Sequence, residues 1–438
     1  MDKTKIYWAV GGVGAILLVI FLGWFFFFRG SSSPSGGNTN QKLTLNIWGV
    51  FETSEGMNTF ITEFNKNNPN VEVTYSQRNV DTYEDDLINA LAINQGPDIL
   101  VIHNDWLPKY QNKLLPAPDN LVSLRDYKNN FVDTVYSDFV SENKIWAAPI
   151  AIDSLALYYN KDILGSASIA VPATTWQELK NQSQRITNRG AGSFFNRSGV
   201  ALGTNANINR AVDILYLLML QDRVEPYSSD FSQPTFDQAI TQKDGSSFFP
   251  AADALNFYTS FSNPTSDNYT WNSRSNYSID AFANGELGYM YGYYYARDLI
   301  AQKAPNLNYD ITPVPQPDNI QTLVNFANYW GFAVSKQTKN PNTAWNFIKA
   351  MTSKNALKKY YEVNKMPSPR KDIINEQIGD PEIGVFASAN LTAKSFYKKD
   401  QVKADGIFQT MIDDIILRGR TIENAISTAA QKISGLGQ

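Results

Sequence analysis

Short apolar strands alternate with amphipathic helices in the part of the chain that follows residue 42. Residues 43–47 and 71–75 alternate apolar and polar side chains as strands do, whereas residues 57–64 and 83–91 place apolar side chains at helical spacing. A buried strand, 98–102, comes next. The order β-α-β-α-β predicts a parallel sheet with helices on its faces, and therefore an α/β fold.

The same alternation continues to the end of the chain. We expect further strands at 200–202, 287–291, 309–313 and 329–335, and helices that begin at Trp176 and cover 207–221, 253–261, 279–284 and 422–433. The chain contains no short repeat and no second linker. Its length favours two tightly connected α/β lobes of about 200 residues each.

Composition excludes several classes of site. The chain has no cysteine and a single histidine, His103, so disulfides, cysteine metal sites and thiol nucleophiles are excluded, and any Ser-His-Asp triad would need that one residue. The net charge is −4 and no basic run is present, which argues against nucleic acid as a partner. Phosphate-binding loops are absent and no carboxylate pair is singled out by its spacing. We therefore expect no enzyme, no cofactor and no bound metal.

The N-terminus predicts a membrane anchor. Residues 6–28 are uncharged and long enough to cross a bilayer, and no cleavage site of small residues follows them. The lysines within residues 1–5 place that segment in the cytoplasm, while the polar residues 29–41 read as a flexible linker. We expect a single-pass protein of the cell membrane, monomeric, whose C-terminal part lies on the extracytoplasmic side.

Aromatic and acidic side chains follow two strands of the first predicted sheet, where open α/β sheets bind ligands. Trp48, Phe51 and Glu52 follow the strand 43–47, and Asp105 and Trp106 follow the strand 98–102. Trp48 fits the core and a ligand site equally well. Asp105 is favoured as a ligand contact over a helix cap, whereas we expect the neighbouring histidine to be structural.

A tyrosine run follows the strand 287–291. Three successive side chains, residues 293–295, cannot all face one core, so at least one of them points to solvent or a cleft, and Tyr294 and Tyr295 become candidate ligand contacts. Trp330 opens the strand 329–335 and fits the core and the site equally. Trp345, at helical spacing with its neighbours, is expected in the core.

Four segments carry a resemblance to a known family. They are WAAPIAIDSLALYYNKDIL (146–164), PATTWQEL (172–179), FANGELGYMYGYYYARDLI (282–300) and YWGFAVSKQTKNPNTAWNFIKAMTS (329–353). In this order the chain resembles the family 1 extracellular solute-binding proteins of ATP-binding-cassette (ABC) importers, the group that includes maltose-binding protein. The chain departs from the usual lipoprotein form because it has no cysteine to acylate.

The resemblance implies a periplasmic-binding-protein-like fold in which two hinge-linked lobes close on a ligand in an interlobe cleft. Lobe 1 would contain 42–151 and 292–336, and lobe 2 would contain 152–291 and 337–438. The chain would cross between them near 150–154, 291–293 and 335–340. By position, the resemblance makes these residues candidate sugar contacts: Asp105, Asp153, Tyr295, and Asn205 or Asn207.

The function implied is the capture of a sugar or oligosaccharide and its delivery to the permease subunits of the importer. Sugar rings offer apolar faces to aromatic side chains and hydroxyl groups to carboxylates and amides, which matches the candidate residues. Two alternatives stay open. The tyrosine run with His103 is also typical of ferric-ion binders, and two carboxylates could form a glycoside hydrolase site.

Overall fold

The computed structural model describes residues 42–242, 244–318, 320 and 322–437. The predicted anchor, residues 6–28, and the linker lie outside the described residues. Residues 44–438 form one compact unit. Within the described part of the chain, no helix is both long and apolar enough to cross a bilayer.

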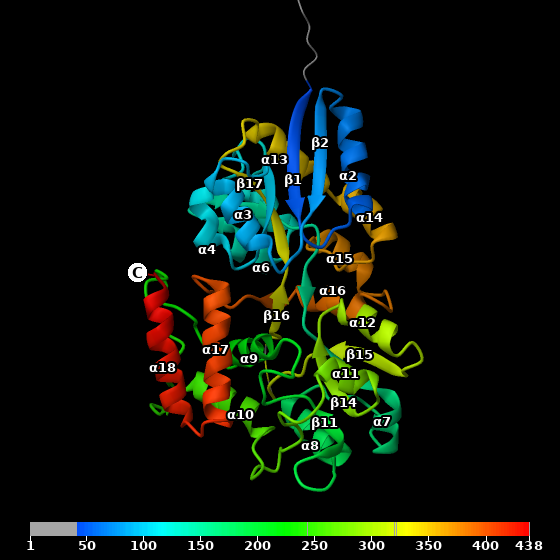
Figure 1. Cartoon of the computed structure of the whole chain (residues 1–438), viewed down its shortest axis with the longest axis vertical. Coiled ribbons are helices and arrows are strands. Elements are labelled where there is room, and N and C mark those ends of the chain that lie inside the picture. The colour runs from blue at the N-terminus through cyan, green and yellow to red at the C-terminus, as the bar shows by residue number, and fades with distance from the viewer. Residues whose placement is uncertain (1–41, 243, 319, 321, 438) are drawn as a thin grey trace, which may run out of the picture. The chain divides into compact units, whose positions relative to one another are not determined.

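The first sheet is the predicted β-α-β-α-β unit, completed by strands from later in the chain (Figure 1). β1 pairs in parallel with β3, whose five residues are all buried, and β17 pairs with β3 in the antiparallel direction. The strands, in spatial order, are β2 (Val71–Gln77), β1 (Leu43–Gly49), β3 (Ile99–His103), β17 (Trp330–Ser335) and β4 (Leu114–Leu115), with β7 (Ala147–Ala148) also paired to β17.

Helices from both halves of the chain accompany this first sheet. α2 packs beside β2, and α13 and α14 pack against α2 (Figure 1). Trp345 of α13 is 1% exposed, which confirms its predicted place in the core. The helices are α2 (Ser54–Asn67), α3 (Tyr83–Ala92), α4 (Leu107–Tyr110), α5 (Leu124–Asn130), α6 (Asp133–Phe139), α13 (Pro341–Met351), α14 (Lys354–Val363) and α15 (Lys371–Gln377).

The second sheet is built from one continuous stretch of chain. β11 and β14 run in parallel, and β9 pairs with β14 and β15 in the antiparallel direction. Gly199 of β11 is required because a Cβ there would lie 2.2 Å from the backbone oxygen of Ser183 on α8. The strands, in spatial order, are β10 (Asn188–Arg189), β11 (Phe195–Val200), β14 (Leu287–Gly292), β9 (Ala156–Asn160) and β15 (Tyr309–Pro313).

An extensive apolar core surrounds the second sheet. α8 begins at Trp176, as predicted, and it has a capping box in which the side chains of Thr175 and Glu178 accept from each other's backbone N–H. α9 is buried on almost every side, as its apolar sequence predicts. The helices are α7 (Lys161–Ser166), α8 (Trp176–Ile186), α9 (Ala211–Gln221), α10 (Pro250–Ser260), α11 (Ser278–Ala283), α12 (Ala296–Lys303), α17 (Gln401–Ile416) and α18 (Ile422–Ser434).

A third, small sheet joins the segments that run between the two large ones. It contains β18 (Ala393–Lys394), β16 (Asn325–Asn328) and β8 (Asp153–Ser154), and we call it the connecting sheet. Buried Asn390 of α16 (Gly384–Asn390) braces it, since its amide donates to the Ile152 and Ser368 carbonyls and accepts from Ser154. Two hairpins complete the strands: β5 (Val140–Ser141) with β6 (Lys144–Ile145), and β12 (Ile240–Thr241) with β13 (Ser247–Phe248).

Two parts of the chain pack on a different sheet from the one that the expected lobe boundaries assign to them. β15 was expected with residues 292–336 in lobe 1, but it pairs with β9 in the second sheet. α13 and α14 were expected in lobe 2, but they pack on β17 and α2 of the first sheet. Only the expected crossing at 150–154 coincides with a strand of the connecting sheet. The other two strands of that sheet are β16 and β18, instead of residues 291–293 and 335–340.

Candidate functional site

An aromatic cluster forms where β1 and β3 end. Because β17 runs antiparallel to β3, its first residue, Trp330, pairs with His103 at the carboxyl end of that strand. The Trp330 ring centroid lies 4.9 Å from that of Trp106 and 5.9 Å from those of Phe51 and Tyr83, all in edge-to-face geometry. Three of the predicted site residues are therefore brought together here.

The rings of this cluster differ in what they can offer a ligand. Trp106 is 6% exposed and lies stacked between Tyr83 and Tyr110, so both of its faces are covered and it packs as a core residue. Phe51 is 55% exposed and rests on the partly exposed Trp330. The accessible aromatic surface of the cluster is thus provided by Phe51 and Trp330.

Trp48 and Glu52 lie at the end of β1. Trp48 is partly buried, and the Arg78 guanidinium carbon lies 3.6 Å above its ring, so one face of the indole is occupied by a cation–π contact. Arg78 Nε is buried and has no hydrogen-bond partner among the described residues. Burial raises the pKa of the Glu52 carboxyl, and the backbone oxygen of Glu52 accepts a 2.6 Å hydrogen bond from Tyr75.

Asp105 belongs to a buried ion cluster. One carboxylate oxygen lies 2.5 Å from His103 Nδ1, as expected for a structural histidine, and the other lies 2.8 Å from Lys398 Nζ. Burial acts to raise the pKa of Asp105, but the charges of His103 and Lys398 outweigh it and hold the pKa well below its usual range. Lys398 also lies 3.4 Å from Asp405 of α17. Both oxygens of Asp105 therefore already have cationic or hydrogen-bonding partners within the protein.

The tyrosines that follow β14 face three different surroundings. Tyr293 is buried and donates to Asp213 at 2.8 Å, whereas Tyr294 is partly buried against Phe386. Tyr295 is 36% exposed, which confirms that at least one member of the run reaches solvent. Its hydroxyl donates to Asn209 Oδ1 at 3.1 Å and accepts from Arg210 Nε at 3.4 Å.

Asp153 of β8 has an incomplete set of partners. Its Oδ2 accepts the backbone N–H of Tyr294 at 2.8 Å, but its buried Oδ1 has no partner among the described residues. Burial raises the pKa of this carboxyl to about 8. The predicted site residue thus stands where the connecting sheet meets the tyrosine run, with one carboxyl oxygen that has no partner among the described residues.

Asn205 and Asn207 lie in the loop between β11 and α9. Asn207 was expected to open the helix, but α9 begins at Ala211, because the Asn207 amide donates to the carbonyls of Asn272 and Ser275, both at 2.9 Å, and so holds the loop. Its Oδ1 accepts from buried Trp271. Asn205 lies partly buried beside Asp413. Neither amide reaches the tyrosine run.

Sequence reasoning missed three polar residues of the site: Arg78, Asn209 and Arg210. Asn209 is 5% exposed, and its Nδ2 has no hydrogen-bond partner among the described residues. Arg210 has a left-handed backbone, with φ +57°, immediately before α9. No periodicity marks a residue in such a loop. The only signal available was position: Arg78 directly follows β2 of the first sheet, and Asn209 and Arg210 lie in the loop after β11 of the second sheet.

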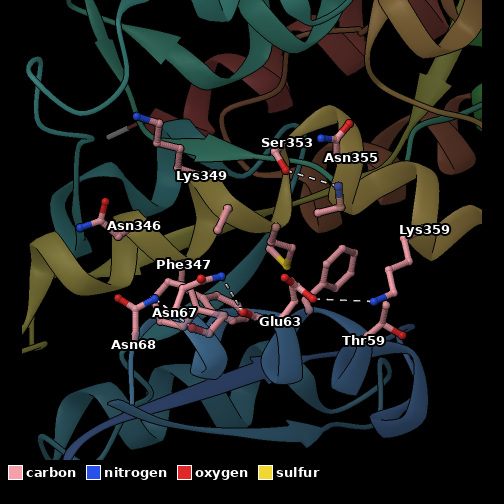
Figure 2. A pocket seen from close by; sticks show the side chains of 15 residues that line it. Thr59, Glu63, Asn67, Asn68, Asn346, Phe347, Lys349, Ser353, Asn355 and Lys359 are labelled. Atoms are coloured by element: carbon pink, nitrogen blue, oxygen red, sulfur yellow. Dashed lines mark hydrogen bonds and ion pairs between the residues drawn. The ribbon is translucent and has the colours of Figure 1, made fainter. Parts of the chain in front are cut away.

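A separate groove of about 700 Å³ lies on the helical layer of the first sheet (Figure 2). α2, α13 and α14 form it, and none of the predicted site residues lines it. Lys359 of its rim lies 3.8 Å from Glu63. In the described ranges, no group of three or more histidine and acidic side chains is arranged to hold a metal ion.

Known proteins that are similar to this chain include the following three. A maltotriose-binding protein of Pyrococcus abyssi is 23% identical over 330 residues, which are 72% of this chain and 62% of that protein. Among solved structures, a cyclic α-maltosyl-1,6-maltose binding protein from Arthrobacter globiformis has a TM-score of 0.73 at 15% identity, covering 90% of this chain and 98% of that one. An ABC transporter solute-binding protein from Thermotoga lettingae, bound with α-D-tagatose, has a TM-score of 0.68 at 20% identity, with 90% and 99% covered.

These structures share the α/β solute-binding-protein fold with this chain. The family model described as bacterial extracellular solute-binding protein matches residues 59–384, which is well over half of the sequence. That match confirms the family resemblance of the four sequence segments, and the chain belongs to the bacterial extracellular solute-binding proteins.

Proposed function

We propose that this protein is the substrate-binding subunit of an ABC importer and that it captures a sugar or oligosaccharide. The observation that carries the proposal is the exposed aromatic surface at the strand ends of both sheets: Phe51 on Trp330 after the first sheet, and Tyr295 after the second. Aromatic faces beside unpaired polar atoms match the alternating apolar and hydroxyl surfaces of a sugar. The similar maltotriose-binding protein supports the same ligand class.

The proposed mechanism uses two lobes, each built around one large sheet, with the connecting sheet as the hinge. A sugar held by Phe51 on one lobe and by Tyr295 on the other would contact both lobes only when they are closed. Ligand binding would then shift an open–closed equilibrium toward the closed state, which the permease recognises. The anchor at residues 6–28 would keep the protein beside its permease on the extracytoplasmic side of the membrane.

Calorimetric titration of the full-length chain in detergent tests the binding function. We expect at least one member of a panel of neutral and acidic oligosaccharides to bind, and Phe51→Ala to weaken that binding about tenfold through lost apolar contact. Phe249→Ala is the matched control, because Phe249 is also 55% exposed but precedes α10, far from the strand ends named above. Absence of binding across the panel, or equal losses in both variants, would refute the proposal.

A further inference from the structure

The loop that leads into α9 holds a buried hydrogen-bond donor without an acceptor. Asn209 Oδ1 accepts from the hydroxyls of Tyr295, at 3.1 Å, and Tyr277, at 3.2 Å. Its Nδ2 is buried and finds no partner in the part of the chain that the structure describes. Buried amide donors are nearly always paired in folded proteins. The unpaired Nδ2 beside Tyr295 therefore indicates a ligand that brings an acceptor.

The Arg210 guanidinium is linked to the Asn209 side chain through the Tyr295 hydroxyl. Its central carbon lies 5.7 Å from the Tyr293 ring and 6.0 Å from the Tyr295 ring, and its Nε donates to the Tyr295 hydroxyl. Among the ion pairs within 4.0 Å in the described ranges, none involves Arg210. Arg210 is an exposed residue. Desolvation of its guanidinium by neighbouring groups acts to lower its pKa, but Asp213 and the two tyrosines raise the pKa above its usual value, so the group stays charged.

The N-terminus of α9 adds to the positive character of this corner. The helix has eleven residues, and no side chain caps its first turn, where Arg210 is the N-cap residue. The positive end of the helix dipole therefore faces the same region as the guanidinium. Asp213 in the first turn offsets part of this charge, but its carboxylate accepts the Tyr293 hydroxyl and is buried.

We propose that the captured solute is an acidic oligosaccharide, and that Arg210 and Asn209 Nδ2 bind the carboxylate of one of its uronic acid units beside the Tyr295 ring. The inference rests on the proposed function. A carboxylate only accepts hydrogen bonds, and the unpaired atoms at this corner, Arg210 Nη and Asn209 Nδ2, only donate them. A hydroxyl of a neutral sugar would leave its own proton without an acceptor there.

The acidic groups nearest to this corner are compatible with an anionic ligand. Asp213 is committed to Tyr293. Asp153 accepts the Tyr294 amide through Oδ2, and its raised pKa of about 8 leaves it mostly protonated at neutral pH. Its protonated Oδ1 would then donate to a sugar oxygen instead of repelling the carboxylate.

The test compares the affinity of the full-length chain, in detergent, for acidic oligosaccharides with its affinity for the uncharged methyl esters of the same oligosaccharides. The probes are trimers of galacturonate, glucuronate and mannuronate, each beside its methyl ester, together with maltotriose, mannotriose, a sulfated trisaccharide and sodium acetate. We expect at least one uronate trimer to bind about 10- to 100-fold more tightly than its ester, because a charge-assisted bidentate contact is lost in the ester. We also expect this preference to shrink as salt rises.

Substitutions at the proposed contacts test where the carboxylate of the bound uronate lies. Arg210→Gln and Asn209→Asp should each reduce uronate affinity about 10- to 100-fold while changing ester affinity little, and Arg210→Lys should restore part of the loss. Arg274→Gln is the matched control, since the Arg274 guanidinium also lies 5.7 Å from an aromatic ring, that of Phe194, but on another loop. Unchanged unfolding curves would show that the variants remain folded.

The possible outcomes separate the two proposals. If maltotriose, mannotriose or the esters bind at least as tightly as the uronates, or only the sulfated sugar binds, the acidic-sugar inference is overturned and the sugar-binding function stands. If uronates bind but Arg210→Gln and Asn209→Asp bind them normally, the assigned position is wrong. If no sugar binds, or acetate alone does, the sugar-binding function itself fails.

Discussion

Asp105 and Asp153, both at strand ends, have opposite electrostatic surroundings. Asp105 has His103 and Lys398 within 2.8 Å and stays ionised, because these charges outweigh the effect of burial on its pKa. Asp153 has only a backbone N–H within hydrogen-bond distance and burial raises its pKa to about 8. The first carboxyl is therefore a structural ion, whereas the second is free to respond to pH or to a ligand.

Asp153 should make the unliganded protein less stable as pH rises. Its pKa is higher in the folded protein than in the unfolded chain, so the folded state binds the extra proton between about pH 4 and pH 8, and stability falls across that window. Arg210, Tyr158 and Tyr293 are the ionisable groups that act on this carboxyl. The total loss should be about 2 to 5 kcal/mol.

Urea unfolding at pH 4.5, 6.5 and 8.5 measures this dependence. Asp153→Asn keeps the shape of the protonated acid and should lose much less stability than the wild type over the same range. Parallel curves for the two proteins would contradict the assigned protonation.

Trp106 and Phe51 should separate stability from binding. Trp106 is stacked on both faces, so Trp106→Ala should lower the free energy of unfolding by about 3 to 5 kcal/mol. Phe51→Ala removes an exposed ring and should change unfolding by well under half of that. Thermal and urea unfolding of the two variants provide the comparison, and equal losses would place Phe51 in the core.

At the scale of elements, the ion pair of Lys398 with Asp105 joins the loop before α17 to the end of β3. Lys398 is 5% exposed, and its second partner, Asp405, lies on α17 itself. Lys109 after β3 adds a partly exposed contact to Asp400 at 3.4 Å. The two large sheets are thus connected by charge as well as by the connecting sheet.

Lys398→Met should destabilise the protein strongly. The change leaves the buried Asp105 and the partly exposed Asp405 without their shared cation, and removing one partner of a buried ion pair typically costs about 3 to 5 kcal/mol. Lys403→Met is the control, because Lys403 lies 3.4 Å from Asp400 but its side chain is 66% exposed, and such pairs contribute at most about 1 kcal/mol. Similar unfolding midpoints for the two variants would show that the buried pair is dispensable.

The longer strands and helices could be predicted from the sequence because each buries one face, which spaces its apolar residues at a regular interval. Strands β1, β2, β3 and β17 of the first sheet and the helix at 422–433 appear where the apolar pattern or helical spacing places them, whereas the two-residue strands β4 and β7 were not predicted. The connecting sheet was missed as such because its strands are two to four residues long, too short for any period. The first turn of the predicted helix at 207–221 is a loop because the Asn207 amide bonds backbone carbonyls more than sixty residues away.

The candidate site was predictable in its location but not in its details. Strand ends pointed to Phe51, Asp105, Tyr295 and Trp330, since ligands bind at such edges. Which of these side chains is satisfied within the protein depends on distant partners. Lys398, almost 300 residues from Asp105, is one example that local pattern cannot reveal.

At the scale of the whole molecule, folding should not require the N-terminal segment. Residues 44–438 form one compact unit, and the linker sequence 29–41 contains no apolar face. A chain that begins at Lys42 should unfold in a cooperative transition with the same midpoint as the full-length protein. An insoluble product, or a gradual transition by circular dichroism, would show that the first 41 residues contribute to the fold.

The proposed anchor makes a second prediction at this scale. Full-length protein should remain in the membrane fraction after high-salt washing. In cells whose cytoplasmic membrane is intact but whose cell wall is permeabilised, added protease should digest the C-terminal part of the protein. Recovery of a soluble form that starts after Gly30 would indicate cleavage instead.

The position of β17 in the sequence affects the order in which the two large sheets can form. β17 lies at the centre of the first sheet beside β3, yet more than 220 residues separate the two strands in the sequence, whereas the second sheet uses only residues 156–313. If the chain emerges on the extracytoplasmic side with its N-terminus first, the second sheet can pair as soon as β15 has emerged. The first sheet must wait with β3 uncovered until residue 335 arrives. Until then the N-terminal part of the chain exposes the unpaired apolar edge of β3, and such an edge favours association with other chains.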